Sequence, residues 1–407
     1  MLAGKLAGHR NAAVLCHNHP EMATATGWKE LEFRIRFLTP AFLGDAEQKG
    51  RWRTPPFKAL LRQWWRVAYA ARHNYGVSIA EMREAEGKLF GNAWLTRQED
   101  GKQKADYSRS KVRLRLEPWK LGELERWQNL EPSGVVHPEV DRPSIGPHLY
   151  LGYGPLDFSR GTILKRAPAI KADESATLRL AFPAGEETLL LQALRLMHLY
   201  GTVGGRSRNG WGSFVLEPRP DGSAPIPTRK WEAALAQSWA HAIGEDGQGA
   251  LIWRTTKTYQ DWRELMRDLA IIRIAVRTQF AFRGTEPHKQ PEPRHWLSYP
   301  VAKHTCEPWG KRLRLPNSLR FKVRPVSGNA NQLIGIIYHM PCLPPDEFGP
   351  QPYREQIKET WRQVHWLLDE LGKPAGQRKF EGRINESKWL QKVSPQLSGI
   401  TLQRIEE

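Results

Sequence analysis

Cysteine is scarce in this sequence of 407 residues. The only three are Cys16, Cys306 and Cys342, and they lie too far apart for a zinc-ligand pair or a disulfide framework. This scarcity is typical of a reducing compartment, so we expect a cytoplasmic location. Cys16 lies near His17 and His19, and His304 lies close to Cys306. A metal site divided between these two groups is an alternative, but isolated Cys and His are usually packing or surface residues, so we expect no metal and no other cofactor.

Long hydrophobic runs are also missing. The chain has no uninterrupted apolar run that could span a bilayer and no basic amphipathic anchor. The first residues lack the continuous apolar segment of a signal peptide. We therefore expect no membrane partner, and we interpret residues 1–27 as a flexible, weakly basic arm.

Acidic residues are too few to balance the basic ones. The chain has 43 Asp and Glu against 61 Lys and Arg, which gives a net charge of +18. Such an excess attracts polyanions, because each neutralised phosphate releases condensed counterions. Without a membrane segment, nucleic acid is the expected partner. The 17 tryptophans would also suit base stacking, although most tryptophans in any domain belong to the core.

The familiar nucleotide and enzyme motifs are absent as well. The sequence has no P-loop, and its glycine-rich stretch does not leave a strand and open a helix as the dinucleotide fingerprint must. No Ser/His/Asp trio and no carboxylate cluster for a two-metal nuclease is evident. We therefore expect neither ATP, nor NAD, nor any other small molecule as a substrate.

The glycine-rich stretch at 201–214 is the most informative segment of the chain. Five glycines alternate there with Arg206, Ser207, Arg208 and Trp211. Glycine lets the main chain approach an anion closely, and arginine adds bidentate hydrogen bonds to phosphate. We interpret the segment as a phosphate cradle in which Trp211 offers a face for a base. The alternative is a tight turn that leads into a strand.

The first half of the chain alternates strand and helix signals. Period-two alternation predicts strands at 31–38, 111–116, 176–182 and 212–217, whereas helical spacing and end signals predict helices at 55–72 and 186–200. This strand, helix, strand, strand, helix, strand order is the split-βαβ, ferredoxin-like pattern. The predicted domain covers 28–217, with a long insertion around 91–170.

A basic stripe marks the predicted helix at 55–72. Lys58, Arg62 and Arg66 recur every fourth residue, opposite an apolar face. The stripe is either a solvated face or a set of phosphate contacts.

The second half, 229–407, follows a proline-rich linker at 218–228. Helices are plausible at 231–243, at 262–270 and at 353–371, while 271–276 fits either helix or strand. A hairpin is indicated at 319–339 by alternation around Ser327-Gly328-Asn329. These elements fit a second, degraded copy of the same fold, so we expect an α+β protein with two ferredoxin-like (βαββαβ) domains and long loop insertions.

Three segments together resemble a known family. They are the glycine-rich loop at 201–214, Phe37-Leu38-Thr39-Pro40-Ala41-Phe42-Leu43-Gly44, and the run from Arg53 to Arg66. In these motifs the sequence is similar to the RAMP superfamily of CRISPR-associated proteins, and most of all to the first-named RAMP subunit of the type III-B (Cmr) effector complex.

The resemblance implies a non-catalytic, RNA-binding subunit that holds the 3′ part of the guide RNA and helps to capture target RNA in antiviral defence. Its partners would be the guide RNA, the target RNA and other RAMP subunits of the Cmr complex. The positions matching the family motifs are the implied RNA contacts: Lys58, Arg62, Arg66, Gly204, Gly205, Arg206, Ser207, Arg208 and Trp211.

The alternative comes from the same superfamily. Some RAMP proteins are metal-independent endoribonucleases that process guide RNA precursor with a histidine as general acid or base. His73 and His198 are the candidates, because one follows the basic helix and the other precedes the glycine-rich loop. Each is also compatible with an ordinary helical histidine.

Overall fold

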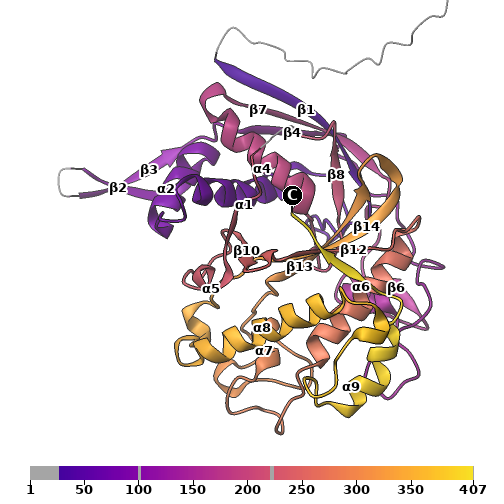
Figure 1. Cartoon of the computed structure of the whole chain (residues 1–407). Coiled ribbons are helices and arrows are strands. Elements are labelled where there is room, and N and C mark those ends of the chain that lie inside the picture. The colour runs from indigo at the N-terminus through magenta and orange to yellow at the C-terminus, as the bar shows by residue number, and fades with distance from the viewer. Residues whose placement is uncertain (1–26, 100–101, 221–223, 407) are drawn as a thin grey trace, which may run out of the picture.

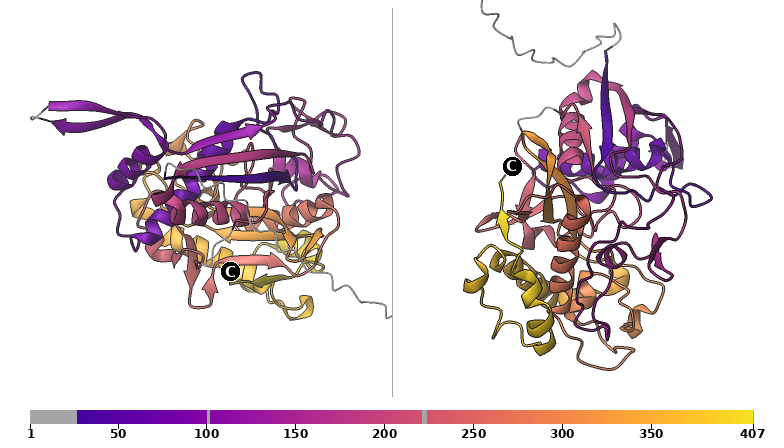
Figure 2. Two further views of the ribbon diagram at one scale, coloured as in Figure 1. Left: turned by 90° about the horizontal axis from the view of Figure 1, so that it is seen from above. Right: turned by 90° about the vertical axis from the view of Figure 1, so that its right-hand side faces the viewer.

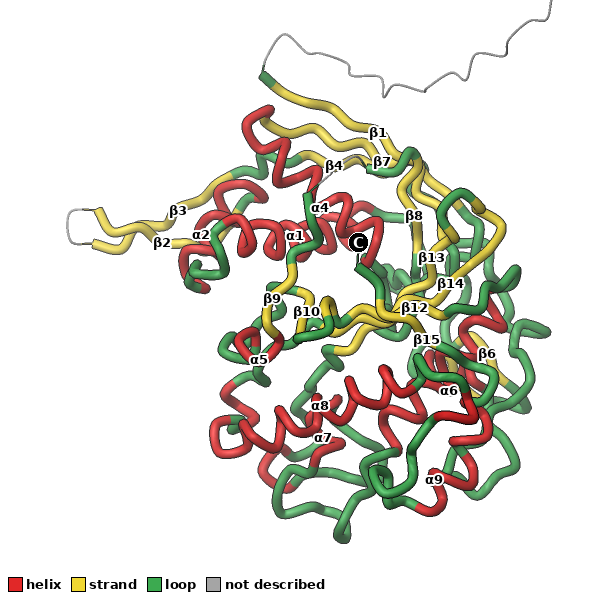
Figure 3. Tube along the Cα trace, viewed as in Figure 1, coloured by secondary structure: helices red, strands yellow, loops and turns green. Residues whose placement is uncertain are grey.

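The structure is a computed structural model that describes residues 27–99, 102–220 and 224–406. The predicted arm at 1–27 lies almost entirely outside the described residues, as do Cys16, His17 and His19. The segment at 27–217 forms a four-stranded antiparallel sheet covered by two helices (Figures 1 and 3). Its elements are β1 (Trp28–Phe37), α1 (Thr54–Arg72), β4 (Arg113–Glu117), β7 (Ser175–Pro183), α4 (Glu187–Tyr200) and β8 (Phe214–Glu217).

The strand order β4-β7-β1-β8 is that of a ferredoxin-like fold. Residues that alternate along β1 and β7 bury one face of the sheet, where Phe33, Ile35, Leu178 and Leu180 are almost fully covered. The opposite face is charged, and Arg179 there donates to Glu32 at 2.6 Å and to Glu117 at 3.0 Å.

Several smaller elements interrupt this fold. They are α2 (Ile79–Phe90), β2 (Asn92–Glu99), β3 (Lys102–Ser108), α3 (Pro147–Gly152), β5 (Leu156–Phe158), β6 (Thr162–Leu164) and a 3-10 turn at Ala184–Glu186. Strands β2 and β3 form a hairpin that extends away from the body of the molecule (Figure 2). The polar composition of this segment did not indicate a hairpin.

The second half repeats the arrangement. Its elements are β12 (Ile252–Thr255), α6 (Trp262–Thr278), β13 (Leu319–Val326), β14 (Asn329–His339), α8 (Arg354–Glu370) and β15 (Leu402–Arg404), and the sheet order is β13-β14-β12-β15. This is the same strand order as in the first fold. The predicted α+β class with two ferredoxin-like folds is therefore confirmed, and the second copy is reduced in that β12 and β15 have only four and three residues.

The remaining elements lie around this second fold. A small sheet joins β9 (Thr228–Lys230), β10 (Ile243–Asp246) and β11 (Gly249–Ala250), and α5 is a single turn at Trp231–Ala234. The helix predicted at 231–243 therefore ends early, at Ala234, and Ile243 is the first residue of β10. The other elements are α7 (Pro293–Leu297), α9 (Ser387–Lys392) and short 3-10 turns at Glu307–Trp309, Asp346–Phe348, Gln351–Tyr353, Ala375–Gln377 and Ser394–Leu397.

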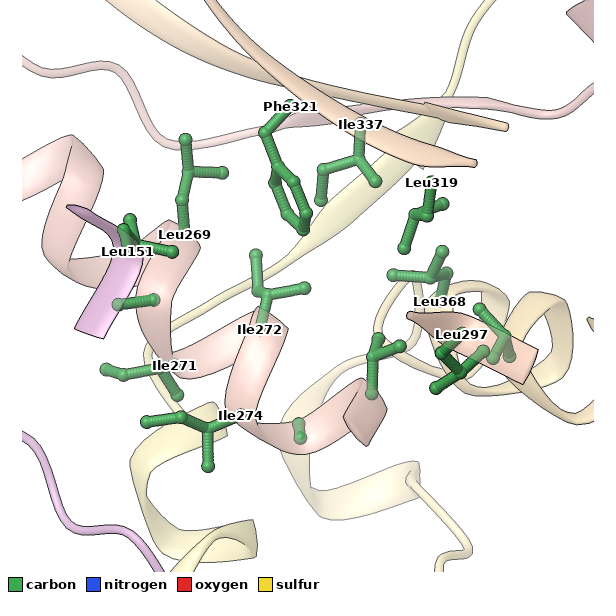
Figure 4. Close-up of a cluster of buried hydrophobic side chains, with 14 of the residues drawn as sticks. Leu151, Leu269, Ile271, Ile272, Ile274, Leu297, Leu319, Phe321, Ile337 and Leu368 are labelled. Atoms are coloured by element: carbon green, nitrogen blue, oxygen red, sulfur yellow. The ribbon is translucent and has the colours of Figure 1, made fainter. Parts of the chain in front are cut away.

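The two folds stack into four layers, sheet, helices, sheet, helices, as Figure 1 shows from top to bottom. Strand β14 is buried on both faces, which explains its nearly continuous apolar run. Its Ile336 and Tyr338 join the core around α1 and α4, whereas Ile337 joins the core around α6 and α8 (Figure 4). Tyr338 lies against Tyr200 of α4 with ring centroids 5.0 Å apart. The helices of the first fold thus pack against both sheets.

A buried lysine fixes this stacking. Lys322 of β13 has no exposed surface, and its Nζ donates to the carbonyl oxygens of His198, Gly201 and Phe214 at 2.6, 2.7 and 2.9 Å. These carbonyls lie at the C-terminal end of α4 and at the start of β8. A cation there offsets both the helix dipole and the unpaired carbonyls of the last turn.

Candidate nucleic-acid interface

The glycine-rich loop begins where α4 ends and folds back tightly on residues 38–43. Gly205 N donates to the carbonyl of Phe42 at 2.9 Å, and Gly212 N donates to that of Pro40 at 2.9 Å. Gly212 has a φ of +64°, and a Cβ there would lie 1.9 Å from the carbonyl oxygen of Val203. Only glycine fits this position. The glycine amides thus serve mainly the tight turn, the alternative that the sequence left open.

The expectation that Trp211 stacks on a base is wrong. Its side chain is fully buried in a cluster of aromatic rings. Trp127 lies 5.4 Å away, and the rings of Phe42 and His148 both lie 5.5 Å away. The indole anchors the loop to the insertion and to the second fold, because Trp262 of α6 also belongs to the cluster. The sequence pattern identified the loop but did not indicate which of its side chains are buried by the rest of the protein.

The loop presents its charged residues to a cavity of about 930 Å³ between the two folds. Arg206, Ser207 and Arg208 line this cavity. Arg206 Nε donates to the carbonyl of Tyr153 at 2.6 Å, and Arg208 Nη1 donates to that of Asn317 at 2.9 Å. These bonds hold both guanidinium groups in place at the cavity wall.

The opposite wall adds cations that sequence reasoning missed. The cavity is lined by Arg273 and Arg277 of α6, Arg294 of α7, and Lys303 and Arg314 of the following loop. Among the described lining residues the only carboxylate is Glu139, and it is paired with Arg294. The signal was available: Arg273 and Arg277 stand four apart in the otherwise apolar run Ile271-Ile272-Arg273-Ile274-Ala275-Val276-Arg277.

Burial sets the electrostatics of the cavity. It lowers the pKa of Arg208 to about 10, with a contribution from Arg320, and lowers that of Arg273 to about 9, with a contribution from Arg277. Both guanidinium groups remain cationic at neutral pH. Burial also lowers the pKa of His137, at the same wall, to about 4, so this imidazole is neutral. The fixed positive charge therefore comes from the arginines and Lys303.

The basic stripe lies elsewhere. Lys58 Nζ donates to Ser110 Oγ at 2.8 Å, and Arg62 and Arg66 both donate to the buried carboxylate of Glu86 in α2, at 2.5 and 2.7 Å. None of the three lines the cavity. The stripe is thus not part of the cavity between the folds. It is not a free solvated face either, because Glu86 of α2 lies between the like charges of Arg62 and Arg66. Its contact with RNA remains a prediction.

The histidines proposed for catalysis do not reach the cavity either. His73 is exposed and lies against Tyr69, with ring centroids 4.4 Å apart. His198 Nδ1 accepts from Leu216 N at 3.2 Å, and burial together with Lys322 lowers its pKa to about 3. The imidazoles that do line the cavity are His137 and His304.

Two classes of feature are not found in the part of the chain that the structure describes. No group of three or more His, Cys, Asp or Glu side chains there is arranged to hold a metal ion. No helix there is long and apolar enough to cross a membrane.

Comparison with known proteins identifies the first fold. Residues 34–215 match the family model of the RAMP superfamily. This segment is therefore similar to the RAMP superfamily. This confirms the resemblance seen in the sequence, and the match includes the basic helix and the whole glycine-rich loop at 201–214. No curated protein matches the chain.

A solved structure is also similar to this chain. The apo crystal structure of Cmr1 from Pyrococcus furiosus aligns with 15% sequence identity and a TM-score of 0.37, over 78% of this chain and 89% of that chain. The similarity to the RAMP superfamily rests on the family match over residues 34–215, because the overall superposition is weak.

Proposed function

We propose that this RAMP protein is an RNA-binding subunit of a type III-B CRISPR effector complex, where it holds the 3′ part of the guide RNA and helps to capture target RNA. The observation that carries the binding role is the cavity between the folds, lined by seven Lys and Arg side chains and one paired carboxylate. A cavity with this charge suits a polyanion. The RAMP motifs support the assignment to a CRISPR complex.

The composition of the cavity favours the RNA backbone as the bound part. Arginine matches phosphate geometry bidentately, and backbone contacts position a strand without reading its sequence. At the rim, Tyr153 is 62% exposed and adjoins Arg206. Its ring, rather than Trp211, is the aromatic face on which a base could stack. Sequence preference should therefore be slight.

Exposed apolar side chains support partners in a complex. Phe158 and Ile163 on β5 and β6, and Trp119 and Leu121 after β4, are large hydrophobic residues left in solvent. All four belong to the segment at 91–170, so this segment is our candidate for contact with other RAMP subunits. The cellular site would be the cytoplasm, where guide RNA is assembled.

The test is the salt dependence of single-stranded RNA binding. Arg206→Glu and Arg208→Glu should each weaken affinity and reduce the slope of log K against log salt by roughly 0.7 for one lost phosphate contact. The matched control is Arg115→Glu, an exposed residue on the charged face of β4, which should leave the slope unchanged. An unaltered slope in both loop variants would contradict the proposed site.

One observation keeps the nuclease as a second candidate. His137 and His304 line the same cavity as the arginines, and a metal-independent endoribonuclease needs an imidazole beside cations that hold the phosphate. The assay is cleavage of guide RNA precursor in EDTA. Cleavage that is lost in His304→Asn would establish the enzyme, whereas intact RNA under conditions of full binding would support the non-catalytic subunit.

A further inference from the structure

The deep wall of the cavity is built differently from its rim. Arg273 is only 9% exposed and Arg294 only 4%, although both line the cavity. Arg273 Nη1, Arg294 Nε and Tyr150 Oη are buried and have no hydrogen-bond partner in the protein. Three donors from α6, α7 and α3 are therefore unsatisfied around one space. Buried donors are rarely left in this state unless something else accepts their hydrogen bonds.

The positive charge at this wall is also uncompensated. Arg277 lies one helical turn from Arg273 and donates to the hydroxyl of Ser298, which is neutral. Within the described residues, no ion pair joins Arg273 or Arg277 to a carboxylate. Arg294 alone has an acidic partner, Glu139. Buried arginines of like charge repel each other unless an anion lies between them.

These features point to an anion with high charge and several acceptor oxygens. An internal phosphodiester has one negative charge and two free oxygens. A terminal phosphate monoester has three free oxygens and nearly two charges at neutral pH, so it can accept from Arg273, Arg294 and Tyr150 together. A terminal phosphate is also attached to the RNA chain on one side only. The chain therefore does not have to leave the cavity again beyond the buried wall.

We propose that this wall, formed by Tyr150, Arg273, Arg277 and Arg294, is a binding site for the terminal phosphate of an RNA strand. The inference rests on the proposed RNA-binding function and adds a ligand class to it: an RNA end that carries a phosphate monoester. Arg206 and Arg208 then hold the backbone of the nucleotides that follow the terminal phosphate toward the rim.

The experiment compares oligonucleotides of one sequence with hydroxyl ends, with a 3′-phosphate or with a 5′-phosphate, at a single salt concentration. An oligonucleotide longer by one nucleotide, with hydroxyl ends, controls for the added charge. The full-length protein should bind one of the phosphorylated forms at least about tenfold more tightly than either hydroxyl form. The end that gives the gain identifies the bound terminus.

Variants then locate the effect. Tyr150→Phe and Arg277→Gln should reduce the phosphate preference toward unity, because each should weaken binding of the phosphorylated oligonucleotide more than binding of the hydroxyl form. Tyr107→Phe on the projecting hairpin should leave both affinities, and so the preference, intact. Circular dichroism verifies that each variant is folded. Equal affinity of the unmodified protein for all four oligonucleotides would overturn the terminal-phosphate site alone, whereas failure to bind any RNA would overturn the proposed function.

Discussion

Trp211 and Trp119 show how differently two tryptophans of one chain can behave. Trp211 is fully buried in an aromatic cluster, whereas Trp119 is 59% exposed. Trp211→Ala should lower the free energy of unfolding by about 3–5 kcal/mol, because it leaves a cavity where four rings meet. Trp119→Ala should change it by about 0.5 kcal/mol or less. Urea denaturation measures both, and equal effects would contradict the structural role of Trp211.

The same residue shows the limit of sequence reasoning at this scale. The spacing of arginines and glycines was enough to select Arg206 and Arg208, which do line a basic cavity. Trp211 faces away from that cavity because it packs against Trp127 and Trp262. Both residues are distant in the chain, and no sequence pattern indicated that they contact the loop. Arg273 was missed for the opposite reason, since it stands in an apolar run that indicated only a buried element.

At the scale of elements, Lys322 joins a strand of the second fold to a helix of the first. Lys322→Met removes hydrogen bonds to three carbonyls and a buried positive charge next to them. We expect the free energy of unfolding to fall by at least roughly 2 kcal/mol, because charge-assisted hydrogen bonds are lost and buried acceptors stay unsatisfied. Lys311→Met, at an exposed position, is the control. A variant as stable as the control would show that the carbonyls find other donors.

Element prediction succeeded where the local signal was long. The β13–β14 hairpin and helices α1, α4 and α8 follow the predicted periodicity closely, and the ambiguous run at 271–276 is helical within α6. The short strands β12 and β15 were missed, because four or three residues cannot establish a period of two. Strand β12 pairs with β14 and with β15, and these partners are separated from it by many residues in the chain.

At the scale of the whole molecule, the two folds share a layer rather than meeting at an edge. The first pair of helices lies under one sheet and over the other, and the hydroxyl of Tyr338 donates to the carbonyl of Tyr200 at 2.7 Å. Two similar units with a linker were predictable from the order of elements. Their stacking was not, because an apolar run such as β14 does not reveal what covers its second face.

This shared interior also determines how the protein should respond to acid. Burial lowers the pKa of His137, His148 and His295 to about 4 and that of His365 to about 3. In the unfolded chain each would titrate near 6.5. Below that pH the unfolded state therefore binds more protons than the folded state, and the free energy of unfolding falls as the pH is lowered. Above about pH 6.5 this contribution is constant.

The decisive window is pH 6.5 to 5.5, because most carboxylates stay ionised there. Each buried histidine should remove up to roughly 1.4 kcal/mol per pH unit. Glu131, whose pKa is raised by burial, acts in the opposite direction but is a single group. His148→Phe keeps a ring stacked against Trp262 and removes one titration, so the slope of its stability against pH should be smaller, by about half a proton at pH 6.5 and by nearly one at pH 5.5. Urea denaturation of both proteins across this window measures the difference, and parallel slopes would show that His148 binds protons equally in the folded and unfolded states.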